Sequence, residues 1–276
     1  MSISAADVKK LRDLTGAGMM DCKKALAEAN GNMEEAIEYL RKKGQKVSAQ
    51  RADREAKQGI IVAFIGENGK KAVALELNCE TDFVARNEEF QANAEAFAKL
   101  AFESNVSDAA AFRELPYEGI TVAKQLETLV GKIGEKIDVS KINIMETAGQ
   151  IVSYIHPGSQ LAVLVDFEGA LKNDEVGKDV AMQIAAMSPI ATRREEVDAS
   201  VLEKEREIAK ELLINEGKPA DIAEKAAEGK IRRFFEERVL LEQKFVKDGS
   251  VTVAQYLKQS GEPSVNTFKR LQLGEH

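Results

Sequence analysis

Only a few side chains in this sequence are of the types that nucleophilic or metal chemistry requires. They are two cysteines, Cys22 and Cys79, and two histidines, His156 and His276. A cysteine that meets a histidine in the fold could act as a nucleophile, but a buried, inert cysteine is far commoner. The cysteines form no Cys-x-x-Cys pair, so the sequence predicts neither a zinc site nor a disulfide framework. We expect both to be buried, reduced thiols.

Motifs of enzymes and nucleotide-binding proteins are absent from the sequence. It contains no Gly-x-x-x-x-Gly-Lys-Ser/Thr loop, no Gly-x-Gly-x-x-Gly segment after a strand, no His-Glu-x-x-His and no Gly-x-Ser-x-Gly. We therefore expect neither an enzyme nor a cofactor. The formal net charge of -7 and the short, interrupted basic runs disfavour direct binding to nucleic acid.

The composition is that of a soluble protein. Hydrophobic residues make up 44% and charged residues 31% of the 276 residues. No apolar run approaches the roughly 20 residues that a membrane-spanning helix needs. The N-terminus lacks the basic start and the apolar stretch of a secretory signal. We expect a cytoplasmic protein with no membrane partner.

The first part of the chain predicts three short helices. Ser4 with Asp7 resembles a capping box, and Asn32 with Glu35 forms a second capping pair. The Thr-Gly-Ala-Gly run at residues 15–18 breaks the first helix, and Asn-Gly at 30–31 ends the second. The segment that follows is polar and charge-rich, which suits a tether, whether helical or not.

The middle of the chain predicts a β-hairpin followed by helices. Apolar runs at residues 59–65 and 71–77 flank an Asn-Gly turn signal at 68–69. The first helix beyond the hairpin is expected to pack an aromatic and alanine stripe against the inner face of the hairpin. The stripe is formed by Phe83, Phe90, Ala94, Phe97 and Ala101. A second helix follows and carries Val122, Leu126, Leu129 and Ile133.

The pattern of strands and helix then repeats. Strands are predicted at residues 142–145, 151–155 and 161–165, followed by an amphipathic helix. Charged helical segments reversing at Glu216–Pro219 indicate an antiparallel helical hairpin. A final strand at Phe268–Leu273 is expected to rejoin the second sheet.

These patterns predict an α+β protein with a three-helix N-terminal domain, a core of two α+β subdomains with antiparallel sheets, and an inserted antiparallel helical hairpin. The predicted boundaries are 1–44 for the N-terminal domain, 45–58 for the linker, 59–138 for the first subdomain, 139–188 with 236–276 for the second, and 189–235 for the hairpin.

Two segments resemble a known family. Residues 11–26 (Leu-Arg-Asp-Leu-Thr-Gly-Ala-Gly-Met-Met-Asp-Cys-Lys-Lys-Ala-Leu) resemble the N-terminal signature of the elongation factor Ts family, and residues 78–85 (Asn-Cys-Glu-Thr-Asp-Phe-Val-Ala) resemble its second signature. The resemblance extends to Lys132–Glu135, to Tyr154–Gly158, to Gly217–Pro219 and to the order of domains over nearly the whole chain.

The resemblance implies a bacterial-type guanine nucleotide exchange factor for elongation factor Tu. It implies a ubiquitin-associated-like N-terminal domain and a helical hairpin often used for dimerisation, although a solvated hairpin of charged helices is an alternative. Some family members continue past the last strand into a helical module that clasps the GTPase. This sequence ends at His276, so we expect that contact to be missing or much reduced.

The resemblance also implies contact residues. Those matching Arg12, Met19 and Met20 pack on the nucleotide-binding domain of the GTPase, and His156 matches a further position that faces it. Without the resemblance, these residues would be interpreted as a solvated arginine, two loop methionines and a turn histidine. Adjacent exposed methionines do make an adaptable apolar contact surface.

The second signature implies the mechanism. Thr81, Asp82, Phe83 and Val84 are expected to form a loop and helix start that is pushed towards the magnesium site of the GTPase. Phe83 would insert as an apolar wedge, and Asp82 would perturb the surroundings of the metal. The alternative is plain helix capping by Thr81 or Asp82, and the two interpretations are compatible.

Two other hypotheses remain open at this stage. A ubiquitin-associated-like adaptor could bind a protein partner through Gly18–Met20 without driving exchange, but it would leave residues 81–84 unexplained. A thiol-dependent enzyme would require Cys22 or Cys79 to be reactive towards alkylating reagents, whereas an exchange factor would bury them.

Overall fold

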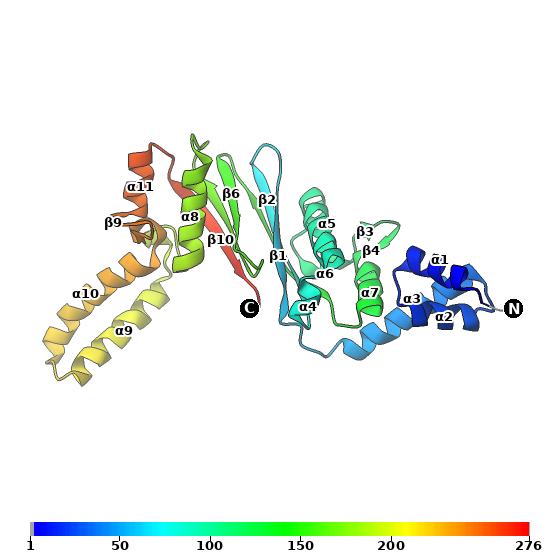
Figure 1. The fold of residues 1–276 in the computed structure, drawn as a ribbon. Helices are drawn as coiled ribbons and strands as arrows, with labels where there is room; N and C mark the ends of the chain where they lie inside the picture. The colour runs from blue at the N-terminus through cyan, green and yellow to red at the C-terminus, as the bar shows by residue number, and fades with distance from the viewer. Residues whose placement is uncertain (1–2, 276) are drawn as a thin grey trace. The chain divides into compact units, whose positions relative to one another are not determined.

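The predicted α+β class is confirmed by the computed structural model, which describes residues 3–275 and mixes helices with small antiparallel sheets (Figure 1). Residue contacts divide the chain into two compact units. The first comprises residues up to Val62, Val73–Ile144 and the end of the chain from Leu273, and the second comprises Ala63–Ala72 and Met145–Gln272. The domain boundaries given above stay a prediction, and His276 lies outside the described residues.

The three N-terminal helices are α1 (Ala5–Thr15), α2 (Met19–Glu28) and α3 (Met33–Arg51). Both predicted capping pairs are confirmed. Ser4 and Asp7 form a reciprocal capping box on α1, and the Asn32 side chain accepts hydrogen bonds from the first turn of α3. The helices enclose a small apolar core of Val8, Leu11, Cys22, Ala25, Leu26, Ala29 and Ala36. Because α3 continues to Arg51, half of the segment predicted as a linker is helical.

Helix α3 crosses α7 (Val122–Ile133) within the first unit, and the contact is backbone to backbone. Gly44 of α3 faces Gly131 of α7, and a Cβ atom placed on Gly131 would lie 2.5 Å from the Gly44 Cα atom. Two glycines in register allow the helix axes to approach more closely than any side chain would permit. The N-terminal helices are therefore packed onto the core and are more than a tethered module.

The first sheet has the strand order β1-β2-β5. Strands β1 (Gln58–Ile65) and β2 (Lys71–Cys79) form the predicted hairpin, which turns through Gly66 to Gly69. The third strand, β5 (Asp138–Glu146), covers the predicted strand 142–145. This strand, expected in the second subdomain, pairs in the first sheet, because strand pairing is set by long-range contacts that local sequence does not record.

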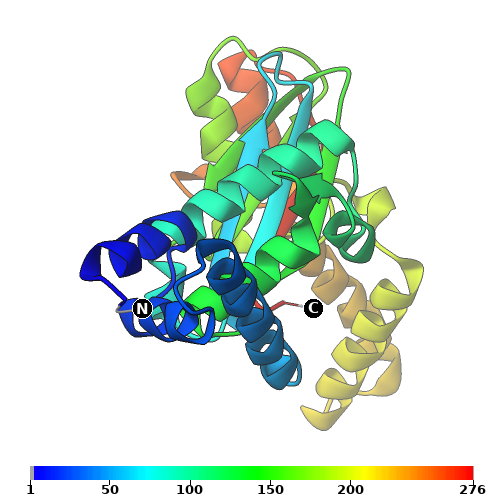
Figure 2. The same cartoon turned by 90° about the vertical axis from the view of Figure 1, so that its right-hand side faces the viewer.

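Two helices follow β2, where the sequence predicted one. They are α4 (Asp82–Ala85) and α5 (Glu88–Ser104), which lies along the first sheet in Figures 1 and 2. Phe90, Ala94, Phe97 and Ala101 are fully buried as expected. Phe83 does not join this stripe and is 82% exposed. The physical reason is Asn87, whose side chain accepts hydrogen bonds from the N–H groups of residues 89 and 90 and starts a new helix.

The second sheet has the order β10-β7-β6, all antiparallel. Its strands are β6 (Gln150–Ile155), β7 (Leu161–Phe167) and β10 (Val265–Gln272), so the predicted return of the last strand is confirmed. Helices α8 (Asp174–Met187) and α11 (Val253–Ser260) contribute Val180, Ile184 and Leu257 to the core beside this sheet.

The predicted antiparallel helical hairpin is present as α9 (Ala199–Asn215) and α10 (Ala220–Arg238). Its seam is small, with Ala209, Leu213, Ala223 and Ala227 buried between the helices. Near its base Arg194 pairs with Glu242 and lies 4.7 Å from the centre of the Phe235 ring. The remaining short elements are α6 (Ala109–Arg113), β3 (Pro116–Tyr117), β4 (Ile120–Thr121), β8 (Lys244–Phe245), β9 (Asp248–Thr252) and the 3₁₀ helices Arg194–Glu196 and Leu240–Glu242.

The glycine crossing generates a stability prediction. Replacing Gly131 with alanine forces the α3 and α7 backbones apart, and overpacking of this kind typically costs about 1–3 kcal/mol. The matched control is Gly229→Ala in α10, where a Cβ atom meets nothing within 4 Å and should stabilise the helix by up to about 1 kcal/mol. Urea unfolding of both variants gives the comparison. A Gly131→Ala protein as stable as the Gly229→Ala protein would show that the crossing is not tight.

Candidate functional site

The predicted Thr81–Val84 site lies where β2 ends and the short helix α4 begins. Thr81 is the N-cap of α4, and its hydroxyl accepts a hydrogen bond of 3.5 Å from the Val84 N–H. The Cys79 thiol donates to the Thr81 carbonyl oxygen at 3.1 Å. The helix-capping interpretation of this segment is thus confirmed for Thr81, and it leaves open what the exposed residues of the same turn do.

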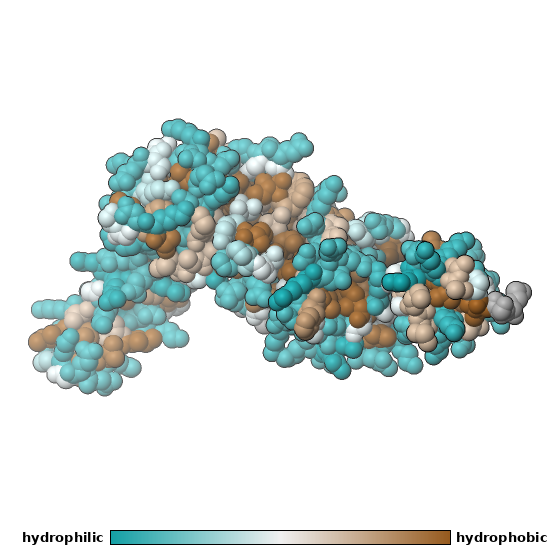
Figure 3. Space-filling model, in the orientation of Figure 1, coloured by the Kyte–Doolittle hydropathy of each residue, from teal (hydrophilic) through white to brown (hydrophobic). Residues whose placement is uncertain are grey.

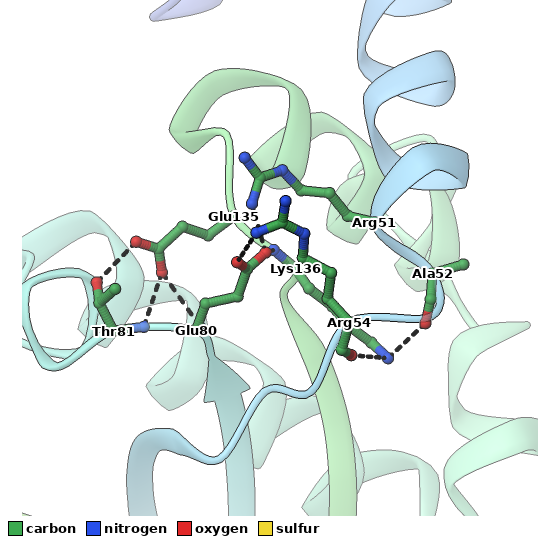
Figure 4. A network of polar contacts seen from close by, with 7 residues as sticks. All are labelled: Arg51, Ala52, Arg54, Glu80, Thr81, Glu135 and Lys136. Atoms are coloured by element: carbon green, nitrogen blue, oxygen red, sulfur yellow. Dashed lines mark hydrogen bonds and ion pairs between the residues drawn. The ribbon is translucent and has the colours of Figure 1, made fainter.

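Glu135 holds the backbone of this loop. One of its carboxylate oxygens accepts the N–H groups of Glu80 and Thr81, at 3.2 and 3.0 Å, and the other accepts the Thr81 hydroxyl at 2.7 Å (Figure 4). Three donors directed at one carboxylate give a rigid arrangement, because hydrogen bonds to a charged acceptor are about twice as strong as neutral ones. The start of α4 is therefore fixed by a residue far along the chain.

Glu80, the neighbour of Thr81, joins the loop to the end of α3. Its carboxylate lies 2.6 Å from the Arg51 guanidinium and 3.3 Å from that of Arg54, and it accepts the Lys136 N–H at 2.7 Å. Burial by itself would raise the pKa of Glu80. The hydrogen bond from Lys136 and the charge of Arg51 outweigh that effect, so the pKa lies below its ordinary value.

Phe83 projects from this fixed turn into solvent, with 82% of its surface exposed. Asp82 beside it forms an i,i+4 ion pair of 3.0 Å with Arg86, and about half of its side chain is accessible. Val84 is partly buried, and Ala85 is buried. The turn thus presents one large apolar side chain and one carboxylate on a backbone that cannot easily move.

The predicted N-terminal contact residues lie on α1 and at the start of α2. Arg12 is exposed, and Met19 and Met20 are 54% and 76% exposed. The loop before them is fixed by Thr15, whose hydroxyl donates to the Leu11 carbonyl at 2.7 Å and accepts the N–H of residue 17. Figure 3 shows apolar residues reaching the surface of the N-terminal helices and of the helical hairpin.

His156 belongs to the second unit, in the turn between β6 and β7. Its N–H donates to the Leu161 carbonyl at 2.9 Å, and its ring Nδ1 lies 3.0 Å from the Tyr154 hydroxyl. The imidazole is exposed. The structure therefore brings Arg12, Met19, Met20 and residues 81–84 into the first unit and leaves His156 in the second.

Both cysteines are fully buried. Burial, reinforced by the negative charge of Glu135, raises the pKa of Cys79 to about 12, and the Cys22 thiol faces the Ala17 carbonyl oxygen at 3.5 Å. Within residues 3–275, no cluster of three His, Cys, Asp or Glu side chains is arranged to hold a metal ion. In the same part of the chain, no helix is both long enough and apolar enough to cross a membrane.

No role was predicted for the residues that hold this loop in place. Glu135 stood inside the Lys132–Glu135 segment that carried the family resemblance, which was its only signal. Glu80 lay one residue before the predicted site, and Arg51 and Lys136 gave no sign of their contacts with it. These partners are 29 to 56 residues apart in the chain, and local patterns cannot pair them.

Exposed apolar side chains on fixed loops are typical of a surface that contacts another protein. A surface of this kind is typical of proteins that act by binding a macromolecular partner. Comparison with known sequences identifies the family. The family described as "Elongation factor TS" matches residues 80–275.

Relatives match over nearly the full length. The chain is 47% identical to Elongation factor Ts of Amoebophilus asiaticus, over 99% of this chain and 100% of the relative. It is 45% identical to that of Prosthecochloris aestuarii and 44% identical to that of Aquifex aeolicus, each over 99% of both sequences. The chain belongs to the elongation factor Ts family and has the role of a translation elongation factor of that family.

The raised pKa of Cys79 predicts an unreactive thiol. At pH 8, a thiol of pKa about 12 is ionised to only about one part in ten thousand, and only the thiolate reacts. We expect iodoacetamide to leave Cys79 unmodified in the folded protein and to modify it readily in guanidinium chloride, as read by peptide mass mapping. Rapid modification of folded Cys79 would revive the hypothesis of a thiol enzyme.

Proposed function

We propose that this protein binds elongation factor Tu in its GDP-bound form and promotes release of GDP, so that GTP can rebind. The observation that supports this most directly is Phe83, an 82% exposed phenylalanine on a turn fixed by Glu135. Burying a phenylalanine side chain is worth about 1.5–3 kcal/mol. In the free protein the Phe83 ring is still in contact with water, so the free energy of burying it is gained only when it inserts into a partner protein.

An exchange factor makes no bond to the nucleotide. A P-loop GTPase holds GDP by backbone amides, a lysine and a magnesium ion that bridges to phosphate. We infer that Phe83 inserts as a wedge near this magnesium site and that Asp82 perturbs the metal's surroundings, while Thr81 and Val84 complete the turn. The activity is thus guanine nucleotide exchange and not the making or breaking of a covalent bond.

Thermodynamic linkage couples the binding of GDP to the binding of the exchange factor. If the factor weakens GDP binding, GDP must weaken binding of the factor by the same ratio. A thousandfold faster release requires about 4 kcal/mol, at about 1.36 kcal/mol per decade. Phe83 alone supplies part of that amount, so a broader interface must contribute the rest. We propose that Arg12, Met19 and Met20 on the N-terminal helices and His156 in the second unit belong to that interface.

The same proposal covers location and other partners. An exchange factor for a translational GTPase works in the cytoplasm, and the formal net charge of -7 opposes direct contact with nucleic acid. No membrane partner is proposed. An adaptor that binds the GTPase without releasing GDP is the alternative function, and the exchange assay below separates the two.

The first test is release of a fluorescent GDP from elongation factor Tu by catalytic amounts of the protein. We expect Phe83→Ala to slow release by about 10- to 100-fold, which corresponds to the burial of one phenylalanine. Its stability should change by less than about 0.5 kcal/mol, because the side chain is exposed. The control is Val246→Ala, another exposed apolar residue, which should release GDP at the wild-type rate. Wild-type release by Phe83→Ala would refute the role of the wedge, and binding without release by the wild-type protein would favour the adaptor.

We also propose a homodimer through the helical hairpin. Ile208, Leu212, Ile214 and Ile222 of α9 and α10 are 43–50% exposed, although the seam between the two helices is already closed. Sedimentation velocity at micromolar concentration should show a dimer that Ile222→Glu converts to a monomer. A wild-type protein that sediments as a monomer over this range would remove the dimer from the proposal and leave the hairpin as a solvated arm.

A further inference from the structure

The segment Lys132–Lys136 contacts both the loop that precedes Met19 and Met20 and the turn that presents Phe83. It follows the end of α7, where Gly134 adopts the left-handed conformation (φ 83°) and turns the chain. Neither the sequence patterns nor the proposed function gives this segment a role. Its side chains nevertheless reach in two directions from one short stretch of backbone.

Lys132 lies against the loop that precedes Met19 and Met20. A Cβ atom placed on Gly16 would be only 2.0 Å from the Lys132 Nζ atom and 2.3 Å from its Cε atom, so the lysine occupies the space that a side chain at Gly16 would fill. The same ammonium group forms an ion pair with Glu89 of α5. Lys132 therefore connects the first loop to the helix that covers the first sheet.

Glu135 and Lys136 hold the other loop. Glu135 accepts three hydrogen bonds from Glu80 and Thr81, which fixes the turn that presents Phe83. Lys136 donates its N–H to Glu80 and its ammonium group to the carbonyl oxygens of Ala52 and Arg54, at 2.7 and 2.9 Å (Figure 4). The Phe83 turn and the end of α3 are thus tied to one another through the same five residues.

We propose that Lys132–Lys136 is a positioning segment that fixes the loop before Met19 and Met20 (residues 16–18) and the Phe83 turn relative to each other, with Lys132 positioning the first and Glu135 the second. This inference rests on the proposed function, in which both loops contact the same GTPase. In a preset arrangement neither loop has to be ordered later, the first one when the GTPase binds and the Phe83 turn when the wedge acts in GDP release. None of these residues needs to touch the partner.

The test is a pair of double-mutant cycles in the GDP-release assay, with the concentration of the GDP-bound GTPase varied to separate kcat from KM. Glu135→Ala should lower kcat by about tenfold, because it releases a turn held by charge-assisted hydrogen bonds, and should leave KM within about twofold. Lys132→Ala should instead raise KM, by about threefold or more, and spare kcat.

Double mutants distinguish a loss of positioning from a general loss of structure. In a Phe83→Ala background, Glu135→Ala should have no further effect on kcat, because a wedge that is absent cannot be misplaced. In a Met19→Ala/Met20→Ala background, Lys132→Ala should have no further effect on KM. Glu135→Gln, which keeps the shape and one acceptor oxygen, should restore part of kcat and serves if Glu135→Ala does not fold. Melting curves establish that each assay is run on folded protein.

Matched controls are Lys124→Ala, an exposed lysine earlier on α7, and Glu95→Ala, an exposed glutamate on α5. Both should behave as wild type. Losses for Glu135→Ala or Glu135→Gln that persist undiminished in the Phe83→Ala background would overturn the positioning role while leaving the proposed function intact. If Phe83→Ala itself releases GDP normally, the proposed function fails first, and this inference fails with it.

Discussion

A carboxylate surrounded by three donors is the interaction on which the rest of the site depends. Glu135 accepts two backbone N–H groups and one hydroxyl at the point where β2 ends. If the carboxylate were absent, those N–H groups would lose their partner, and an unsatisfied, poorly solvated donor costs about 1–3 kcal/mol. The backbone therefore has one favourable path through residues 80–82. That path points Phe83 outwards. The ring is therefore exposed because the hydrogen bonds of Glu80 and Thr81 to Glu135 fix the backbone beside it.

The cost of exposing Phe83 is offset by the core beneath it. Phe90 and Phe97 of α5 are fully buried, and Phe97 makes edge-to-face contacts with Phe112 and Tyr117, with ring centres 6.0 and 5.4 Å apart. A well-packed aromatic cluster of this kind supplies stability that the exposed turn does not have to provide. The division between the exposed turn and the buried helix falls where α4 ends at Arg86 and the Asn87 cap starts α5. Stability and binding are thereby assigned to adjacent stretches of the same chain.

The sequence predicted what local rules control. The caps at Ser4 and Asn32, the hairpin turn and the reversal between α9 and α10 all depend on residues within a few positions of each other, and the structure has them. Phe83 was wrongly assigned to the buried stripe because helical spacing alone cannot show that a cap interrupts the helix. Two features could not be predicted because they depend on tertiary contacts. They are the pairing of β5 with β2 and the hydrogen bonds of Glu135 with Thr81, 54 residues away. The contact residues came from family resemblance and not from physical pattern.

Because α3 crosses α7 at Gly44 and Gly131, the length of α3 determines where the other N-terminal helices lie relative to α7. The helix is clamped to α7 at one position, and the other N-terminal helices pack on its earlier turns. Each residue of an α-helix advances about 1.5 Å and rotates about 100°. One residue inserted or deleted between Ala36 and Gly44 would rotate α1 and α2 by about 100° relative to α7, and would break the Lys43–Asp21 ion pair and the contact of Lys132 with Gly16. The length of this helical segment is therefore constrained as strictly as the identity of any residue in it, and changes in chain length among related proteins should be confined to the turns outside it.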